Sequence, residues 1–335
     1  MPAPVTLSEI AARCGVSAMT VSNVLNNRGK VSQATREQVL TVARQMGYVP
    51  NVLARGLKSG RTQVLGLVLP ALDPVSVEIA QGVQAALSEA RYDMLLYTTS
   101  ADAGRERERV TALSQGLSDG LLIAMPRAAA ADVQIFERSR VPVVLINYNG
   151  PDTRLPTVLA DNFVPARQAT EYLLGLGHRR IGFITGDAGS GQSHERLRGY
   201  RAALEHAGLA VDEHLVRTGD FTQVRGFAAA AELLALPERP TAIFAANDFS
   251  AVGAMEAARH LGLRIPEDVS VVGFDDIPLA SQVFPPLTTV RHPFRALGEG
   301  AAQLLLSILD GKAVPAGPVN LASELVVRGS TAART

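Results

Sequence analysis

Apolar positions recur with a helical spacing in three short segments near the start of the chain. The first segment follows the capping box Thr6-Leu7-Ser8-Glu9, in which the Thr6 hydroxyl accepts from the Glu9 amide, and Gly15 ends it. Ser17 and Ser32 are placed to cap a second, short helix and a third, longer one. Two short helices that are joined by a glycine-containing turn and closed by a third form a helix-turn-helix unit.

From residue 62 onward, the pattern changes to short apolar runs that alternate with amphipathic helical segments. The apolar runs are VLGLVLP, DMLLYTT, GLLIAMP, VPVVLINY, IGFITG, TAIFAAN and VSVVGFD. This alternation predicts an α/β fold with parallel sheets flanked by helices. The stretch from LGLVLP to GLLIAMP is echoed by the stretch from IGFITG to TAIFAAND, which predicts two similar lobes with a ligand cleft between them.

The chain has 335 residues, of which 47% are apolar, so we expect more than one domain. We predict a helix-turn-helix domain over residues 1–50, a hinge and linker over 51–61, and a two-lobed effector-binding and dimerisation domain over 62–335. No apolar run approaches the roughly 18 residues that span a bilayer, and the N-terminus lacks a secretory signal, which predicts a cytoplasmic protein without membrane contact. The single cysteine, Cys14, excludes an internal disulfide and a cysteine-based zinc cluster.

The net charge is zero, but the charges are unevenly distributed along the chain. Residues 1–61 hold eight lysines and arginines against two glutamates, an excess of six positive charges, and the remaining residues carry the matching negative excess. A basic N-terminal region suits a polyanionic partner such as DNA. The alternative is a solvated basic face without a partner.

Two stretches of this basic region carry a family resemblance. TLSEIAARCGVSAMTVSNVLNN and VSQATREQVLTVARQMGYVPNVLARGLKSGR resemble the DNA-binding head of the LacI/GalR repressors. In that family the second helix enters the major groove, which implies base contacts from Ala18, Met19 and Asn23. The resemblance also implies phosphate contacts from Ser17, Thr20, Ser22, Asn26 and Tyr48. Asn23 departs from the arginine or histidine that is often found there; its amide favours adenine, whereas arginine favours guanine.

A further short helix is expected over residues 52–58, with Asn51 as its cap. In the LacI/GalR family this segment is a hinge helix that orders on the operator and inserts a leucine into the minor groove. By position the wedge is Leu57, and its neighbours toward the DNA are Ala54, Arg55 and Lys58. The alternative is a linker helix that makes no DNA contact.

The rest of the chain resembles the periplasmic sugar-binding protein fold, as the bodies of LacI/GalR repressors do. LGHRRIGFITG and AIFAANDFSAVGAMEAARHLGLRIPEDVSVVGFDD carry this resemblance. It implies that the chain crosses between the lobes near Asp161, Arg291–Pro293 and Leu321–Glu324. Four polar residues at strand or loop ends should face the cleft and bind a polyol: Arg196, Asn247, Asp248 and Asp275. By family position, four more candidates for effector contacts are Asn147, Phe221, His292 and Phe294.

Structural roles compete with ligand binding at these positions. Arg196 and Asp275 could form a salt bridge between the lobes, and polar residues such as Asp248 could cap helices. Asn147 replaces an aspartate that is common in the family, so the identity of the effector stays open.

An enzyme is not expected, because GDAGSG at 186–191 has neither the G-x-G-x-x-G spacing nor a following Walker lysine, and no G-x-S-x-G or H-E-x-x-H occurs. We also expect no cofactor and no metal. A sugar-binding transport receptor is the alternative function, although it leaves the basic head unexplained. We therefore predict a transcription regulator that binds a palindromic DNA operator as a homodimer and responds to a sugar or sugar derivative. Release of the operator by an inducer is the expected mode, and a tetramer is not expected, because few residues follow the last strand.

Overall fold

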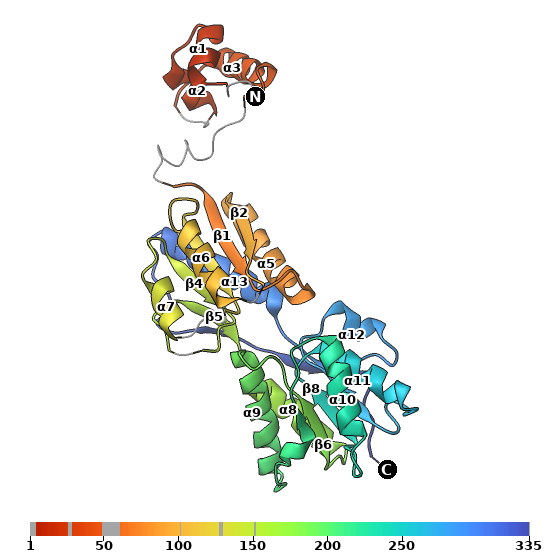
Figure 1. Ribbon diagram of the computed structural model, residues 1–335. Coiled ribbons are helices and arrows are strands. Elements are labelled where there is room, and N and C mark those ends of the chain that lie inside the picture. The colour runs from red at the N-terminus through yellow and green to blue at the C-terminus, as the bar shows by residue number, and fades with distance from the viewer. Residues whose placement is uncertain are drawn as a thin grey trace. The chain divides into compact units, whose positions relative to one another are not determined.

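The computed structural model describes residues 5–25, 29–48, 61–100, 102–126, 130–150 and 152–334. The chain divides into two compact units, Met1–Thr62 and Gln63–Thr335, which we call the head and the body (Figure 1). The described part of the head is helical, and the body is built on parallel sheets flanked by helices. The predicted α/β fold class is therefore confirmed.

Three helices build the described part of the head: α1 (Leu7–Cys14), α2 (Ala18–Leu25) and α3 (Gln33–Gln45). The capping box of α1 is confirmed, because the Thr6 hydroxyl accepts from the Glu9 amide and the Glu9 carboxylate accepts from the Thr6 amide at 2.7 Å. Gly15 ends α1 in the left-handed conformation, at φ +65°. Local signals in the sequence thus determine where these helices begin and end.

The three helices meet in a small apolar core. Ile10, Val21 and Val39, one from each helix, are fully buried, and Cys14 lies with them as a small buried side chain. Because Val21 and Val24 face this core, the opposite side of α2 is left open to solvent.

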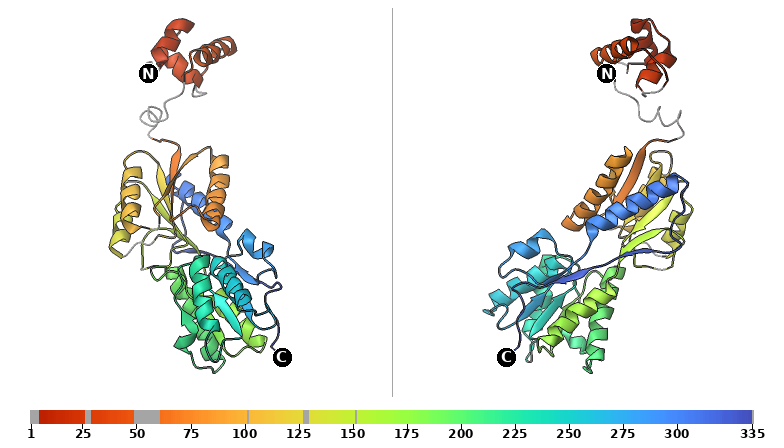
Figure 2. Two further views of the ribbon diagram at one scale, coloured as in Figure 1. Left: turned by 45° about the vertical axis from the view of Figure 1, so that its right-hand side comes forward. Right: turned by 180° about the vertical axis from the view of Figure 1, so that it is seen from behind.

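The first lobe of the body, the N-lobe, is built on six parallel strands. In sheet order these are β11 (Val319–Leu321), β5 (Thr157–Ala160), β4 (Val143–Ile146), β3 (Gly120–Ala124), β1 (Val64–Leu69) and β2 (Asp93–Thr98). Helices α5 (Pro74–Ala90) and α13 (Phe294–Leu309) pack on one face, and α6 (Ala103–Leu113) and α7 (Ala130–Glu137) cover the other (Figure 2). Strands β1, β3 and β4 are buried at every position, which explains their unbroken apolar sequences.

The second lobe, the C-lobe, repeats this design on four parallel strands. In sheet order these are β7 (Val216–Arg217), β6 (Ile181–Ile184), β8 (Ala242–Ala245) and β9 (Ser270–Val272). Helices α8 (Phe163–Gly175) and α9 (Gly191–His206) pack on one face, and α10 (Gln223–Leu234) and α11 (Asp248–His260) on the other. Two short helices, η1 (Glu213–Leu215) and α12 (Pro278–Gln282), complete the lobe.

Three crossings join the lobes. The chain leaves the N-lobe after β5, returns between β10 (Thr289–Arg291) and α13, and crosses again between β11 and β12 (Glu324–Val326). Strands β10 and β12 pair in antiparallel fashion, so the second and third crossings lie side by side. These are the positions that the family resemblance implied for the crossings. The crossings bring residues that are far apart in the chain to the space between the lobes.

The longest helix among the described residues is α5, with 17 residues. A transmembrane helix needs about 20 predominantly apolar residues. Over the described ranges, no helix has the length and apolar character to cross a membrane.

Candidate functional site

The open side of α2 carries the residues that we expect to meet DNA. The Ser17 hydroxyl accepts from the Thr20 amide at 3.1 Å, the bond of an N-cap, and pairs with the Thr20 hydroxyl at 2.9 Å. This pair uses one of the two hydroxyl protons, so the other remains to donate to a phosphate oxygen. Ala18 and Met19 follow on the first turn; both are exposed, and Met19 keeps 60% of its surface accessible.

The other predicted DNA contacts are placed differently. Asn23 is half-buried beside Gly29, where a Cβ would come within 3.3 Å of its Nδ2. Tyr48 is half-buried against the core of the head. Ser22 is only 9% exposed, so we leave it out of the proposed phosphate contacts. The remaining candidates lie outside the described residues: Asn26, Asn51, Ala54, Arg55, Leu57 and Lys58.

Arg196 and Asp275 form the charged centre of the predicted effector site. Arg196 lies on α9 and Asp275 follows β9, and Nη1 of the arginine stands 3.1 Å from Oδ1 of the carboxylate. Both side chains are more than nine-tenths buried. The salt bridge that we considered as an alternative therefore forms, but within the C-lobe and not between the lobes, because both residues belong to elements of the same sheet layer.

Further contacts hold Arg196 in place. Its Nε donates to Asn162 Oδ1 at 2.9 Å, and its Nη1 donates to the carbonyl oxygen of Ala246. The guanidinium carbon lies 3.7 Å from the centre of the Phe274 ring, a cation–π contact. Burial lowers the pKa of Arg196, and the charge of Asp275 opposes this. These contacts hold the Arg196 guanidinium in place, and the guanidinium in turn holds the Asp275 carboxylate through the ion pair.

Asp275 is held in a conformation that few residues adopt. Its φ is +114°, in a region that L residues rarely enter, and such strain is concentrated at functional sites. Burial raises the pKa of the Asp275 carboxyl to about 6, while Arg196 lowers it. The negative charge of Asp73, the cap of α5 in the N-lobe, adds to the rise. The two carboxylates therefore repel each other across the space between the lobes.

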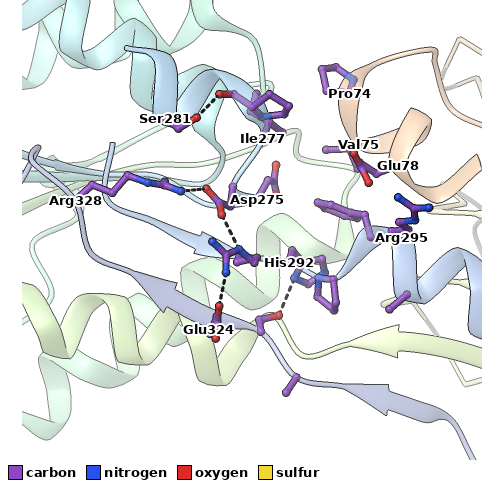
Figure 3. Close-up of a pocket in the computed structure, with 18 residues that line it drawn as sticks. Pro74, Val75, Glu78, Asp275, Ile277, Ser281, His292, Arg295, Glu324 and Arg328 are labelled. Carbon is purple, nitrogen blue, oxygen red and sulfur yellow. Dashed lines mark hydrogen bonds and ion pairs between the residues drawn. The ribbon is translucent and has the colours of Figure 1, made fainter. Parts of the chain in front are cut away.

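A cavity of about 590 Å³ lies between the lobes beside Asp275. In Figure 3, Val75 and Glu78 of α5 lie on one side of it and Asp275 and Ile277 on the other. The crossing segments 291–296 and 322–324 contribute most of the remaining wall, and Pro278, Ser281 and Arg328 complete it. The volume is in the range of ordinary small-molecule sites. Of the predicted effector residues, the structure brings Asp275, His292 and Phe294 together here.

His292 lies among aromatic rings in the second crossing. Its ring centre is 5.6 Å from that of Phe274 and 4.8 Å from that of Phe294, and its Nδ1 pairs with the Ser323 hydroxyl at 3.0 Å. Burial lowers the pKa of His292 well below its usual range, and the charge of Arg196 lowers it further, so the ring is neutral near pH 7. Its Nε2 is buried without a hydrogen-bond partner among the described residues, which leaves it available to a ligand.

Both carboxylate oxygens of Asp248 accept hydrogen bonds, in contrast to the Nε2 of His292, which has no partner among the described residues. Asp248 begins α11 and is fully buried. Its Oδ1 accepts from the Thr289 hydroxyl at 2.5 Å and its Oδ2 accepts from the Ile277 amide at 2.8 Å. Since both oxygens are bonded within the C-lobe, we assign Asp248 a structural role and leave it out of the proposed effector contacts.

Asn247 and Phe221 are connected by a hydrogen bond. Asn247 caps α11 through its Oδ1, which accepts from the Ser250 amide at 3.0 Å, and its Nδ2 donates to the Phe221 carbonyl at 2.9 Å. Phe221 adopts a left-handed φ of +69°, and its ring lies over Gly186, where a Cβ would come within 2.0 Å of a ring atom. Only glycine leaves room for this ring, so Asn247 and Gly186 together position Phe221.

Asn147 follows β4 on the N-lobe side. Its φ is +51°, its side chain is buried, and neither amide atom has a hydrogen-bond partner among the described residues. Its carbonyl oxygen accepts from Gln192 Nε2 at 2.5 Å, a contact that links the N-lobe to α9 of the C-lobe. A buried amide without partners costs free energy, so a bound ligand or water is expected beside it.

Several residues of the site were missed by sequence reasoning. Asp73 had a usable signal, because an aspartate directly before Pro74 is a typical helix start. Asn162, Phe274 and Ser323 had none, because their contacts with Arg196 and His292 join segments that are distant in the sequence. Across the described parts of the chain, no group of three or more His, Cys, Asp or Glu side chains is arranged to hold a metal ion.

Comparison with known proteins assigns the chain to a family. Residues 6–51 match the family described as bacterial regulatory proteins, lacI family, and residues 170–331 match the periplasmic binding protein-like domain. The HTH-type transcriptional repressor CytR of Escherichia coli (strain K12) is 37% identical over 332 residues, which cover 98% of this chain and 96% of CytR. The chain belongs to the LacI family.

Solved structures of LacI-family regulators match almost the whole chain. The lac repressor dimer bound to operator and the anti-inducer ONPF is 30% identical, with a TM-score of 0.89 over 99% of this chain and 100% of that one. A complex of the transcriptional regulator CelR with cellobiose is 36% identical, with a TM-score of 0.75 over 97% and 99%. As a LacI-family member, the protein is a DNA-binding transcription regulator controlled by an effector and is not an enzyme. The predicted role as an effector-controlled, DNA-binding transcription regulator is confirmed, and the transport-receptor alternative is rejected.

Proposed function

We propose that this LacI-family regulator is a homodimeric repressor that binds a near-palindromic operator through α2 and releases it when a sugar or sugar derivative enters the cavity between the lobes. One observation carries the effector proposal: Asp275 is paired with Arg196 on one side and lines a cavity of about 590 Å³ on the other. An ionised carboxylate accepts from two neighbouring hydroxyl groups, which a polyol supplies. Because its target is chromosomal DNA, we propose that the regulator acts in the cytoplasm.

The contacts of the effector are divided between the lobes. Asp275, His292 and Phe294 line the cavity, and Asn147 supplies a buried amide at the carboxyl end of an N-lobe strand. The Phe294 ring offers an apolar surface for a face of the sugar. Arg196 acts mainly by positioning Asp275, and Asn247 acts by positioning Phe221.

A ligand between the lobes changes the balance between lobe arrangements. The Asp73 and Asp275 carboxylates repel each other across the space between the lobes, and ligand hydroxyl groups that donate to them reduce this repulsion. Such a ligand binds one lobe arrangement more tightly, and only this differential affinity can alter operator binding. We propose that the arrangement stabilised by the ligand has the lower operator affinity.

The proposed homodimer is supported by exposed apolar side chains on the body. Strand β2 is an edge of its sheet, and Leu95 and Leu96 on it are both exposed. On the C-lobe, Val224 and Phe284 are exposed to 78% and 85%. Exposed apolar edges and patches are typical of protein interfaces. Two heads in a two-fold dimer match the two half-sites of a palindrome.

The test combines a ligand screen with operator binding. Sugars, sugar acids and sugar phosphates are screened by thermal shift, because a ligand at 100 times its Kd stabilises the folded protein by about 2.7 kcal/mol. The operator is selected from a random duplex library, and its affinity is measured by fluorescence anisotropy with and without each hit. We expect a polyol that raises Tm and weakens operator binding, and a light-scattering mass of twice 35.4 kDa. A hit that strengthens operator binding would overturn induction, and no hit among the three classes would overturn the effector class.

A further inference from the structure

Four charged side chains next to Asp275 form a connected group, which we call the Asp276 cluster. Asp276 is at its centre: Oδ2 accepts from Arg291 Nε at 2.8 Å, and Oδ1 accepts from Arg328 Nη2 at 2.6 Å. Arg291 also donates through Nη1 to Glu324 Oε1 at 2.6 Å. All four residues line the cavity that Asp275 lines, and Figure 3 shows Arg328 and Glu324 on the side away from α5.

Within this cluster the Asp276 carboxylate is the most shielded group. Its side chain is 8% exposed and that of Arg328 is 18% exposed, whereas Arg291 and Glu324 are 53% and 66% exposed. Each carboxylate oxygen of Asp276 already accepts from a guanidinium, and such charge-assisted bonds fix the geometry of both partners. The cluster is therefore suited to hold Asp276 in place, in contrast to Asp275, whose carboxylate we propose as an effector contact.

The backbone at this point is in a conformation that needs support. Asp275 and Asp276 follow each other with φ of +114° and +57°, a region that L residues rarely adopt. Such conformations persist only where the surrounding structure holds them. The Asp275 amide donates to the Val290 carbonyl at 2.8 Å, and the His292 amide donates to the Asp275 carbonyl at 3.3 Å. Between these two backbone bonds, the side chain of Asp276 adds its bond to Arg291.

The partners of Asp276 come from the ends of two crossings. Arg291 is the last residue of β10, where the second crossing begins, and Arg328 follows β12, where the third crossing ends. We propose that Asp276 is a positioning residue: held by Arg291 and Arg328, it keeps the neighbouring Asp275 carboxylate in its effector-binding geometry and links it to the two crossings. This role rests on the proposed effector contact of Asp275.

The first test removes the Asp276 carboxylate from the full-length protein. The probe is the sugar that gives the largest thermal shift in the screen described above, and its affinity is measured by isothermal titration calorimetry. We expect Asp276→Ala to bind this sugar about tenfold more weakly than the wild type. Arg264→Ala is the matched control, because it breaks an ion pair with Asp268 on the same lobe and neither residue lines the cavity; its affinity should stay within about twofold.

A double-mutant cycle separates positioning from a general structural role. If Asp276 acts through Asp275, the double variant Asp275→Ala, Asp276→Ala should bind the sugar no more weakly than Asp275→Ala alone. Effects that add in the double variant overturn the positioning role. So does an Asp276→Ala protein that has a lowered Tm and wild-type sugar affinity. Should Asp275→Ala itself bind like the wild type, the proposed effector contact fails, and the role of Asp276 fails with it.

Arg291 allows the same test without loss of a buried group. Its side chain is 53% exposed, so Arg291→Ala should fold even if Asp276→Ala does not. We expect sugar binding about threefold weaker in Arg291→Ala and closer to the wild type in Arg291→Lys, which keeps a positive charge beside Asp276.

Hydrogen exchange of the sugar-free protein gives a readout that needs no effector. The Asp275 and His292 amides should lose protection in Asp276→Ala and keep it in Arg264→Ala. Unchanged protection of both amides in Asp276→Ala, or equal sugar affinities of Arg291→Ala and the wild type, would overturn the proposal.

Discussion

Two buried aspartates follow neighbouring strands of the C-lobe sheet, and their surroundings are opposite. Asp248 comes soon after β8, and each of its carboxylate oxygens accepts a hydrogen bond from its own lobe. Asp275 comes soon after β9, is paired with Arg196, and lines the cavity between the lobes. Burial raises the pKa of both carboxyls, at Asp275 to about 6. The difference therefore lies in what faces each carboxylate and not in how deeply it is buried.

The segment after Asp275 is responsible for this difference. Ile277 and Thr289, which flank the loop around α12, both donate to Asp248 and not to Asp275. The loop thus completes the hydrogen bonding of the Asp248 carboxylate and leaves the Asp275 carboxylate facing the N-lobe. Two acidic residues in equivalent places along the sequence consequently have different roles, one in stability and one, as we propose, in effector binding.

The largest effect that tests this comparison comes from removing each carboxylate. Asp275→Ala should weaken effector binding about 10- to 100-fold, because hydroxyl groups of the ligand lose a charged acceptor. Operator affinity without effector should persist, since Arg196 keeps its contacts with Asn162, Ala246 and Phe274. Titration of the effector, followed by operator anisotropy, measures both quantities.

Asp248→Ala is the matched control at the neighbouring strand. It leaves the Ile277 amide and the Thr289 hydroxyl without their acceptor, so the free energy of unfolding should fall by about 1–3 kcal/mol. Effector affinity should stay within about twofold. If instead Asp275→Ala lowers Tm and operator binding together and leaves effector affinity intact, the ion pair is structural and Asp275 is not an effector contact.

An intermediate effect is expected from pH. The pKa of Asp275 is raised to about 6, so its contribution to the free energy of unfolding is present below about pH 4 and is lost as the pH rises through 6. Ligand hydroxyls favour the ionised form, so effector affinity should weaken about tenfold between pH 7 and pH 5. Burial and the charge of Arg196 lower the pKa of His292 well below its usual range, which favours the neutral ring.

Calorimetric titration at several pH values measures this dependence. Asp275→Asn, which cannot ionise, should bind weakly and with little change between pH 5 and pH 7. A wild-type affinity that does not vary with pH would contradict ligand contact with an ionised Asp275.

The smallest effect is expected where a positioning contact is removed. Ser323→Ala removes the hydrogen bond to His292 Nδ1 and should weaken effector binding about two- to fivefold, because the ring loses a partner that holds its orientation. Ser281→Ala removes another hydroxyl from the same cavity wall, but one that, within the described ranges, is bonded only to the Pro278 carbonyl, so it should leave affinity unchanged. Equal effects of the two changes would show that His292 is not positioned through Ser323.

Local features of the fold were predictable because their causes lie within a few residues. The capping box at Thr6 and Glu9 and the stop at Gly15 depend on bonds and backbone angles inside one turn. The unbroken apolar runs likewise predict strands that are buried on both faces of a sheet, and β1, β3 and β4 are buried in this way. The motifs of the first sixty residues further allowed the family to be identified before any contact between segments was known.

Only the tertiary structure decided which polar residues share the cavity. In the sequence, Asp248 and Asp275 are equally good candidates at strand ends, and the bonds from Ile277 and Thr289 that distinguish them join segments about 30 to 40 residues apart. Phe274 and Asn162 reach Arg196 when distant segments of the C-lobe pack together, and Ser323 reaches His292 where the second and third crossings lie side by side. Composition and periodicity constrain neighbours along the chain, whereas the partner of a buried polar group depends on which distant segments pack against it. The sequence by itself therefore determined the elements, the lobes and the family, and packing between distant segments determined the chemistry of the cavity.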